Sequence, residues 1–164
     1  MSETTASIHI QPTIEKDELA KLLGGRKKKS LPKSISKKVQ TARKKLTKLI
    51  KPSLQYRIVK PSAMDNDVVQ LDETVEFTST KLARTLKNAE EIVCFVGTIG
   101  TGVEHEINRL LGKQKLADAY ILDAMASVAV ENMIDRFQNL MEKRFGEQDR
   151  TVTYRFSPGY CDWP

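Results

Sequence analysis

The residues best suited to bind a charged ligand lie near the end of the sequence. Arg155 carries a planar guanidinium fork that fits a carboxylate. Pro158 and Gly159 form a turn dipeptide, and a glycine lets a bound molecule approach the backbone closely. Tyr160 adds an aromatic face that suits a cation. These residues predict a ligand-binding edge. The alternative that spacing alone leaves open is a surface turn with an exposed arginine.

Two acids, Asp123 and Glu131, form the second group of candidates. They lie in and just after residues 119–130, a nearly all-apolar stretch with a helical pattern. Eight helical residues turn by about 800°, so the two carboxylates share one side of the helix, with Ser127 between them. Because a buried carboxylate is costly unless it is paired, each acid is a candidate binding group. The alternative is a structural pair with Lys or Arg, or a cap on a neighbouring element.

The end of the sequence also resembles a known family. The pattern Arg155-x-x-x-Gly159-Tyr160 is similar to the R-x-x-x-G-Y-P signature of the activation domain of cobalamin-dependent methionine synthase. Residues 157–164 look more like the small stand-alone bacterial relatives of that domain, with Cys161 in place of the proline of the signature.

The resemblance extends over residues 92–164 and includes the Gly-Thr-Ile-Gly loop at 97–100 and the helix at 122–131. Members of the family continue beyond the signature, so the resemblance predicts a C-terminal truncation at Pro164.

The resemblance implies a binding site for S-adenosylmethionine. In the family a helix glutamate contacts the ammonium group, a role that would fall to Glu131. Arg155 would pair with the carboxylate, and Tyr160 would offer its ring to the sulfonium or the adenine. The backbone of Gly159 and Cys161 would edge the adenosine. No side chain is expected to act as a nucleophile or general base, and no metal site is expected.

The implied activity is the reductive re-methylation of a corrinoid. The methyl group comes from S-adenosylmethionine, one electron comes from a flavodoxin-like or other one-electron donor, and the cobalamin belongs to the partner. The expected partner is methionine synthase or a related corrinoid methyltransferase. The chain would act as its accessory subunit.

The charge of the chain is concentrated in one segment. Residues 26–51 hold twelve Lys or Arg and no acid, whereas the rest of the 164-residue chain holds fifteen basic and twenty-one acidic residues. An alternative function is therefore nucleic-acid binding through this segment, although no aromatic residue interleaves with its lysines.

Cys94 and Cys161 are the only cysteines and form no C-x-x-C, which favours a reducing cytoplasm. No apolar run reaches membrane-spanning length.

The elements that must position these residues follow from periodicity and breaker residues. A glycine-rich loop at residues 97–102 could form a phosphate site or a close-packed turn, and we favour the close-packed turn. Thr101 with Glu104 has a capping-box pattern. We expect helices over residues 17–23, 35–51, 80–88, 101–112 and 116–145, and strands over 7–10, 56–60, 68–71, 74–77, 92–96 and 151–156, with 92–96 as a buried central strand.

The order of these elements predicts an α+β fold, a single domain whose twisted, mainly antiparallel sheet is flanked by helices. A basic helical N-terminal region over 1–52 would extend from an activation-like domain over 53–164.

Overall fold

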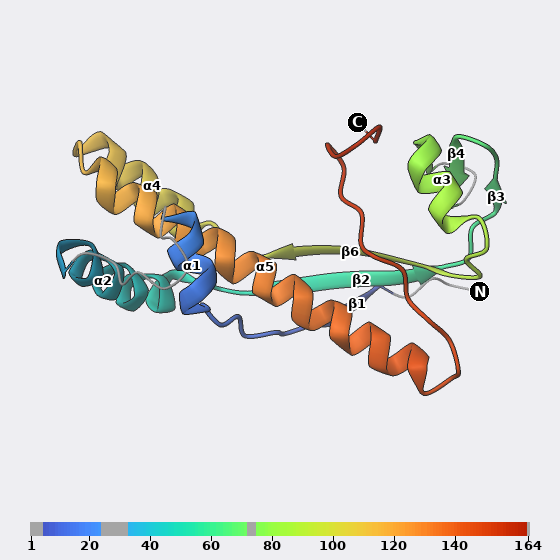
Figure 1. The fold of residues 1–164 in the computed structure, drawn as a ribbon, viewed down its shortest axis with the longest axis horizontal. Coiled ribbons are helices and arrows are strands. Elements are labelled where there is room, and N and C mark those ends of the chain that lie inside the picture. The colour runs from blue at the N-terminus through green and yellow to red at the C-terminus, as the bar shows by residue number, and fades with distance from the viewer. Residues whose placement is uncertain (1–4, 24–32, 72–74, 164) are drawn as a thin grey trace. The chain divides into compact units, whose positions relative to one another are not determined.

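The structure, a computed structural model, describes residues 5–23, 33–71 and 75–163 (Figure 1). In these residues it has five helices and two three-stranded sheets, so the predicted α+β class is confirmed. The helices are α1 (Lys16–Leu22), α2 (Lys33–Leu49), α3 (Thr80–Leu86), α4 (Gly102–Gly112) and α5 (Leu116–Gly146). The strands are β1 (Ala6–Ile8), β2 (Ser53–Val59), β3 (Ala63–Met64), β4 (Val68–Gln70), β5 (Glu76–Thr78) and β6 (Ile92–Thr98).

The strands form two small sheets, where the sequence predicts one. The first has the order β1-β2-β6, and β2 and β6 run in opposite directions (Figure 1). The second has the order β3-β4-β5 and is antiparallel, with Met64 opposite Val69 and Val69 opposite Phe77. The expected buried central strand at residues 92–96 is wrong, because β6 is at an edge of its sheet and Val96 is 67% exposed. An apolar run indicates that a strand is hydrophobic, but it does not distinguish an edge strand, with one paired strand, from a central strand, with two.

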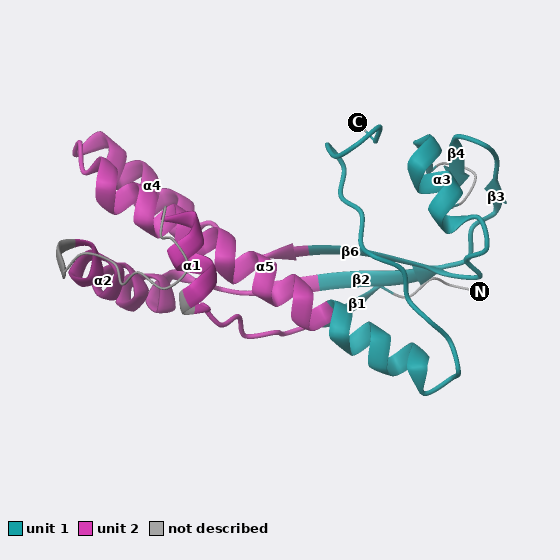
Figure 2. Ribbon diagram, viewed as in Figure 1, with its two compact units in different colours: residues 1–7, 55–96, 138–164 teal, residues 8–54, 97–137 magenta. Residues whose placement is uncertain are grey.

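The chain divides into two compact units (Figure 2). Unit 1 comprises residues 1–7, 55–96 and 138–164, and unit 2 comprises residues 8–54 and 97–137. The helix α5 contributes its first part to unit 2 and its last part to unit 1, and the expected boundary after residue 52 stays a prediction. Each unit has its own cluster of buried apolar side chains.

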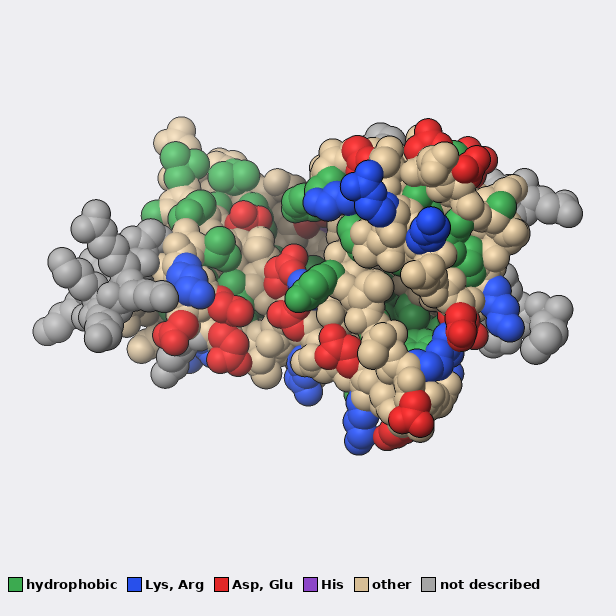
Figure 3. All heavy atoms as spheres, turned by 45° about the vertical axis from the view of Figure 1, so that its right-hand side comes forward, with side chains coloured by type: hydrophobic (Ala, Val, Ile, Leu, Met, Phe, Trp, Pro, Cys, Tyr) green, Lys and Arg blue, Asp and Glu red, His purple; other side chains and the backbone are tan. Residues whose placement is uncertain are grey.

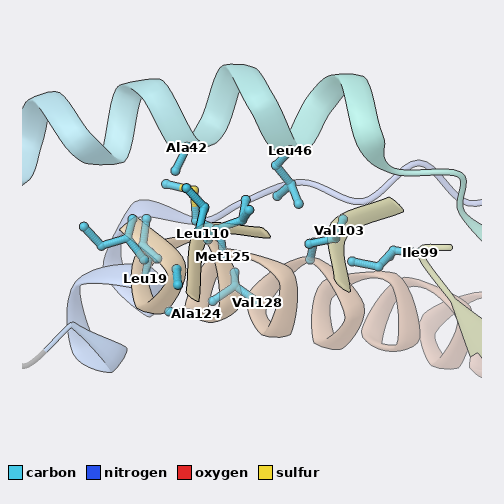
Figure 4. Close-up of a cluster of buried hydrophobic side chains, with 13 residues drawn as sticks. Leu19, Ala42, Leu46, Ile99, Val103, Leu110, Ala124, Met125 and Val128 are labelled. Atoms are coloured by element: carbon cyan, nitrogen blue, oxygen red, sulfur yellow. The ribbon is translucent and has the colours of Figure 1, made fainter. Parts of the chain in front are cut away.

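The cluster of unit 2 gathers side chains from α1, α2, α4 and α5 (Figure 4). The expected helix over residues 35–51 is confirmed as α2, and its Ala42 and Leu46 point into the cluster together with Met125 of α5. Leu46 and Met125 are fully buried, and burial of such a side chain is worth about 1.5–3 kcal/mol. The basic helix is therefore part of the core of unit 2 rather than an extension from it.

The glycine-rich loop at residues 97–102 is a close-packed turn, as predicted. Gly100 has a φ of +84°, and the backbone N–H of Lys51 donates to the Ile99 carbonyl at 2.7 Å. A Cβ on Gly102 would lie 2.9 Å from the Leu49 carbonyl oxygen, so the glycine permits this backbone contact. The predicted capping box is wrong, because Thr101 has right-handed helical dihedrals and its side chain makes no cap hydrogen bond.

The cluster of unit 1 lies between α3 and the second sheet. Val69, Leu82 and Leu86 are buried there, and Phe156 and Trp163 pack against them. The predicted cap of the helix after Ser79 is confirmed, since the Leu82 backbone N–H donates to the Ser79 hydroxyl at 3.0 Å.

Candidate functional site

The terminal segment that carries the candidate ligand-binding residues is not a strand. Residues 151–157 have no regular secondary structure, and residues 158–162 form turns, so the expected strand over 151–156 is wrong. Its β-branched and aromatic residues have strand propensity, but a strand also requires an edge to pair with, and residues 151–156 belong to neither sheet.

The turn after this segment depends on two left-handed residues. Gly159 has a φ of +83° and Cys161 a φ of +58°. The Gly159 N–H donates to the Trp163 carbonyl at 2.9 Å, and the Trp163 N–H donates to the Tyr160 carbonyl at 3.2 Å. A Cβ on Gly159 would meet nothing within 4 Å, so the space beside this backbone is open.

Four of the five candidate residues are exposed on this segment. Arg155, Gly159 and Cys161 are exposed, and Tyr160 is 72% exposed. The Arg155 guanidinium donates to the Gln138 side-chain oxygen at 3.2 Å. The arrangement leaves a cationic fork and an aromatic ring accessible to a ligand.

The end of the segment is fixed to α3 by Asp162. The Ser79 hydroxyl donates to one carboxylate oxygen at 2.7 Å, and the Lys81 backbone N–H donates to the other at 3.1 Å. These hydrogen bonds lower the pKa of Asp162 below its usual value, and the hydrogen bond from Ser79 has the largest effect. Trp163 follows at once and meets the Phe77 ring edge-on, with the ring centroids 5.1 Å apart.

Lys81 makes a second contact with the turn. Its ammonium group donates to the Cys161 sulfur at 3.1 Å, and this hydrogen bond raises the pKa of Lys81. Sequence reasoning missed the roles of Asp162, Ser79 and Lys81. The Ser79 cap was visible in the sequence, but nothing in the sequence connects it to an acid 83 residues away.

The fifth candidate, Glu131, lies on the part of α5 that belongs to unit 2. Glu131, Asp123 and Ser127 are all exposed, while Leu122, Met125 and Ala129 are buried. The argument that these acids are buried is therefore wrong. At a spacing of four residues the polar side chains lie along the solvent-facing side of α5, and the buried apolar side chains lie on its other sides. Their exposure leaves Glu131 accessible to a ligand but removes burial as a reason to choose it.

The basic residues of α2 whose side chains the structure describes fall into two groups. Lys38 pairs with Asp118, Lys45 donates to Glu106 at 2.5 Å, and Arg43 donates to the Ile14 carbonyl at 3.2 Å.

Glu106 also accepts from Arg109, at 2.6 and 2.8 Å. The bonds from Arg109 and Lys45 lower the pKa of Glu106 to about 2.

A second group of lysines on α2, at positions 37, 44 and 48, is exposed and has no acidic partner within the described parts of the chain.

The described residues contain no cluster of three His, Cys, Asp or Glu side chains that could hold a metal ion. Among the same residues, no helix combines the length and the apolar character that crossing a membrane requires. The face of the molecule in Figure 3 carries acidic and basic side chains intermixed rather than a broad region of one sign.

No protein-family model and no curated protein matches this chain. The resemblance over residues 92–164 therefore remains a prediction that rests on the motifs quoted above.

Proposed function

We propose that this chain is a cytoplasmic S-adenosylmethionine-binding activation protein. It supports the reductive re-methylation of the corrinoid of methionine synthase or of a related corrinoid methyltransferase. The observation that carries the proposal is the exposed terminal segment, in which Arg155, Gly159, Tyr160 and Cys161 lie together beside an anchored end.

The groups of S-adenosylmethionine match these residues in kind. A guanidinium pairs with a carboxylate through two parallel hydrogen bonds, which suits Arg155. The exposed ring of Tyr160 suits the sulfonium or the adenine. The open backbone at Gly159 and Cys161 leaves room for the adenosine. Glu131, exposed on α5, is assigned to the ammonium group by the resemblance alone.

The residues of this chain hold and orient the methyl donor. In the proposed reaction the donated electron would reduce the partner's Co(II) corrinoid to Co(I), the methyl carbon would leave the sulfonium sulfur and bond to the cobalt, and S-adenosylhomocysteine would be released. The cobalamin is carried by the partner methyltransferase, and a flavodoxin-like donor supplies one electron. The positioning role explains why the site needs no nucleophile of its own.

Titration of S-adenosylmethionine by calorimetry tests the proposal. Loss of a charge-assisted pair at Arg155 is expected to weaken binding in Arg155→Ala by about 10- to 100-fold. Arg144→Ala is the matched control, since Arg144 is also exposed in unit 1 and makes one 3.3 Å contact with Tyr56. Equal affinity in wild type and Arg155→Ala, or no binding by wild type, would reject the proposal.

A second candidate function is nucleic-acid binding through α2, favoured by the exposed Lys37, Lys44 and Lys48. This function predicts that duplex DNA or RNA binds with a micromolar or lower dissociation constant and that the affinity falls steeply as the salt concentration rises. Under the first proposal these lysines instead dock the acidic electron donor or the corrinoid protein. The first proposal is supported if the wild type binds no nucleic acid and if replacing all three lysines by alanine abolishes binding of the electron donor or of the corrinoid protein.

A further inference from the structure

The terminal turn and the first turn of α3 are joined by three polar contacts. Two reach the Asp162 carboxylate, from the Ser79 hydroxyl and the Lys81 backbone N–H, at 2.7 and 3.1 Å. The third joins the Lys81 ammonium to the Cys161 sulfur at 3.1 Å. Ser79 is 3% exposed, so its hydroxyl is held in place by its own surroundings.

We propose that Asp162 is a positioning residue that fixes the Gly159–Cys161 turn against α3 and so sets where Tyr160 and the open backbone of Gly159 meet a ligand. The inference rests on the proposed function for the identity of that ligand. The fixing of the turn itself stands on the contacts alone.

The physical reason is that the turn is otherwise ordered mainly by its flanking residues Phe156 and Trp163, which pack against the cluster of unit 1. Residues 151–157 have no regular secondary structure, and within the described part of the turn two backbone hydrogen bonds are internal to it. Trp163 packs on Phe77, but a ring contact allows rotation that two hydrogen bonds to one carboxylate do not. Because its two oxygens accept from two separate donors, one of them a backbone N–H, the carboxylate restrains both the position and the direction of the chain at Asp162.

The charged and titratable groups around Asp162 are Lys81 and Cys161, and its remaining contacts are with Ser79 and the backbone N–H groups at the start of α3. The hydrogen bond from Ser79 and those from the backbone N–H groups favour the ionised carboxylate and outweigh its desolvation, so they lower the pKa of Asp162. The contact is therefore expected to persist above the usual pKa of an aspartate and to weaken only as the pH falls below it.

Trp163 is the only tryptophan in the chain, so its fluorescence reports directly on this turn. In Asp162→Asn an NH2 donor replaces one carboxylate oxygen and the negative charge is removed, so neither the Ser79 hydroxyl nor the Lys81 N–H keeps a charged acceptor. We expect the Trp163 emission to shift to longer wavelength and its quenching by acrylamide to rise, while far-UV circular dichroism is unchanged. Glu147→Gln is the matched control, because it removes one exposed acid of unit 1 and should leave Trp163 unaffected.

The affinity for S-adenosylmethionine, measured on the same variants, separates positioning from a merely structural role. Asp162→Asn should weaken binding by about five- to tenfold, with the thermal midpoint within a few degrees of wild type. Unchanged Trp163 fluorescence in Asp162→Asn would overturn the proposed contact. A released Trp163 with unchanged affinity would overturn the positioning role and leave the proposed function intact. If wild type binds no S-adenosylmethionine, the proposed function and the positioning role for that ligand fail together. The Trp163 result still decides whether Asp162 holds the turn.

Discussion

Two glycines of this chain have nearly the same backbone conformation and opposite surroundings. Gly100 and Gly159 have φ values of +84° and +83°. A Cβ on Gly100 would meet Lys51 at 3.2 Å, whereas a Cβ on Gly159 would meet nothing within 4 Å. The loop in unit 2 therefore uses glycine to pack two segments together, and the turn in unit 1 uses glycine to bend in open space. A glycine-rich sequence does not by itself distinguish a structural turn from a binding turn.

The largest expected effect is at the packed loop. In Gly102→Ala the new Cβ would lie 2.9 Å from the Leu49 carbonyl oxygen, so the loop or the end of α2 must move. We expect the free energy of unfolding to fall by about 3 kcal/mol in a urea titration followed by circular dichroism. Gly112→Ala is the control, since its Cβ would meet nothing within 4 Å. Equal stability of the two variants would contradict the close approach.

The next effect is at the anchor of the open turn. Ser79→Ala removes the hydroxyl that accepts from Leu82 and donates to Asp162, and the site is buried. The expected loss is about 2 kcal/mol, with increased quenching of Trp163. Thr85→Ala serves as the control, because Thr85 is exposed on the same helix and its hydroxyl donates to the Lys81 carbonyl. If both variants lost the same small amount, Ser79 would not join α3 to the turn.

A smaller effect is expected at the open glycine. Gly159→Ala should cost about 1 kcal/mol, because it introduces a left-handed alanine but no clash. Gly159→Asn should recover part of this loss, since asparagine tolerates that conformation. The comparison with Gly102→Ala in the same urea titration is decisive: a loss at Gly159 as large as that at Gly102 would mean that the turn is packed rather than open.

The smallest effect concerns the acid that supports α4 beside the packed loop. Glu106 has a folded pKa of about 2 against an ordinary value of 4.5, so its stabilisation is complete above the ordinary pKa and is lost as the pH falls toward 2. Glu106→Gln should destabilise the protein at neutral pH by less than about 1 kcal/mol, because Lys45 and Arg109 are partly exposed.

The difference in unfolding free energy between wild type and Glu106→Gln should shrink as the pH is lowered from 6 to 3. Glu104→Gln, an exposed acid in the first turn of α4, is the control. A difference that stays constant over this pH range would show that the effect is not due to the Glu106 charge.

Three local signals in the sequence are confirmed, whereas the capping box at Thr101 is not. The apolar face of α2, the Ser79 cap and the end of α4 at Gly112 depend on residues within a few positions of one another, and the structure has all three. The candidate site was predicted only in part. Its exposed residues were named, but Asp162 was not, because its partners are 81 and 83 residues away.

The sequence by itself determined roughly where the helices lie, which face of α2 is apolar, and that an arginine, a glycine turn and a tyrosine follow one another at residues 155–160. Only the tertiary structure decided that β6 is an edge strand, that Asp123 and Glu131 face solvent, and that residues 151–156 are not a strand. The physical reason is the range of the interactions. Helix periodicity and caps act within one or two turns, whereas strand pairing and burial depend on partners that are distant in the chain.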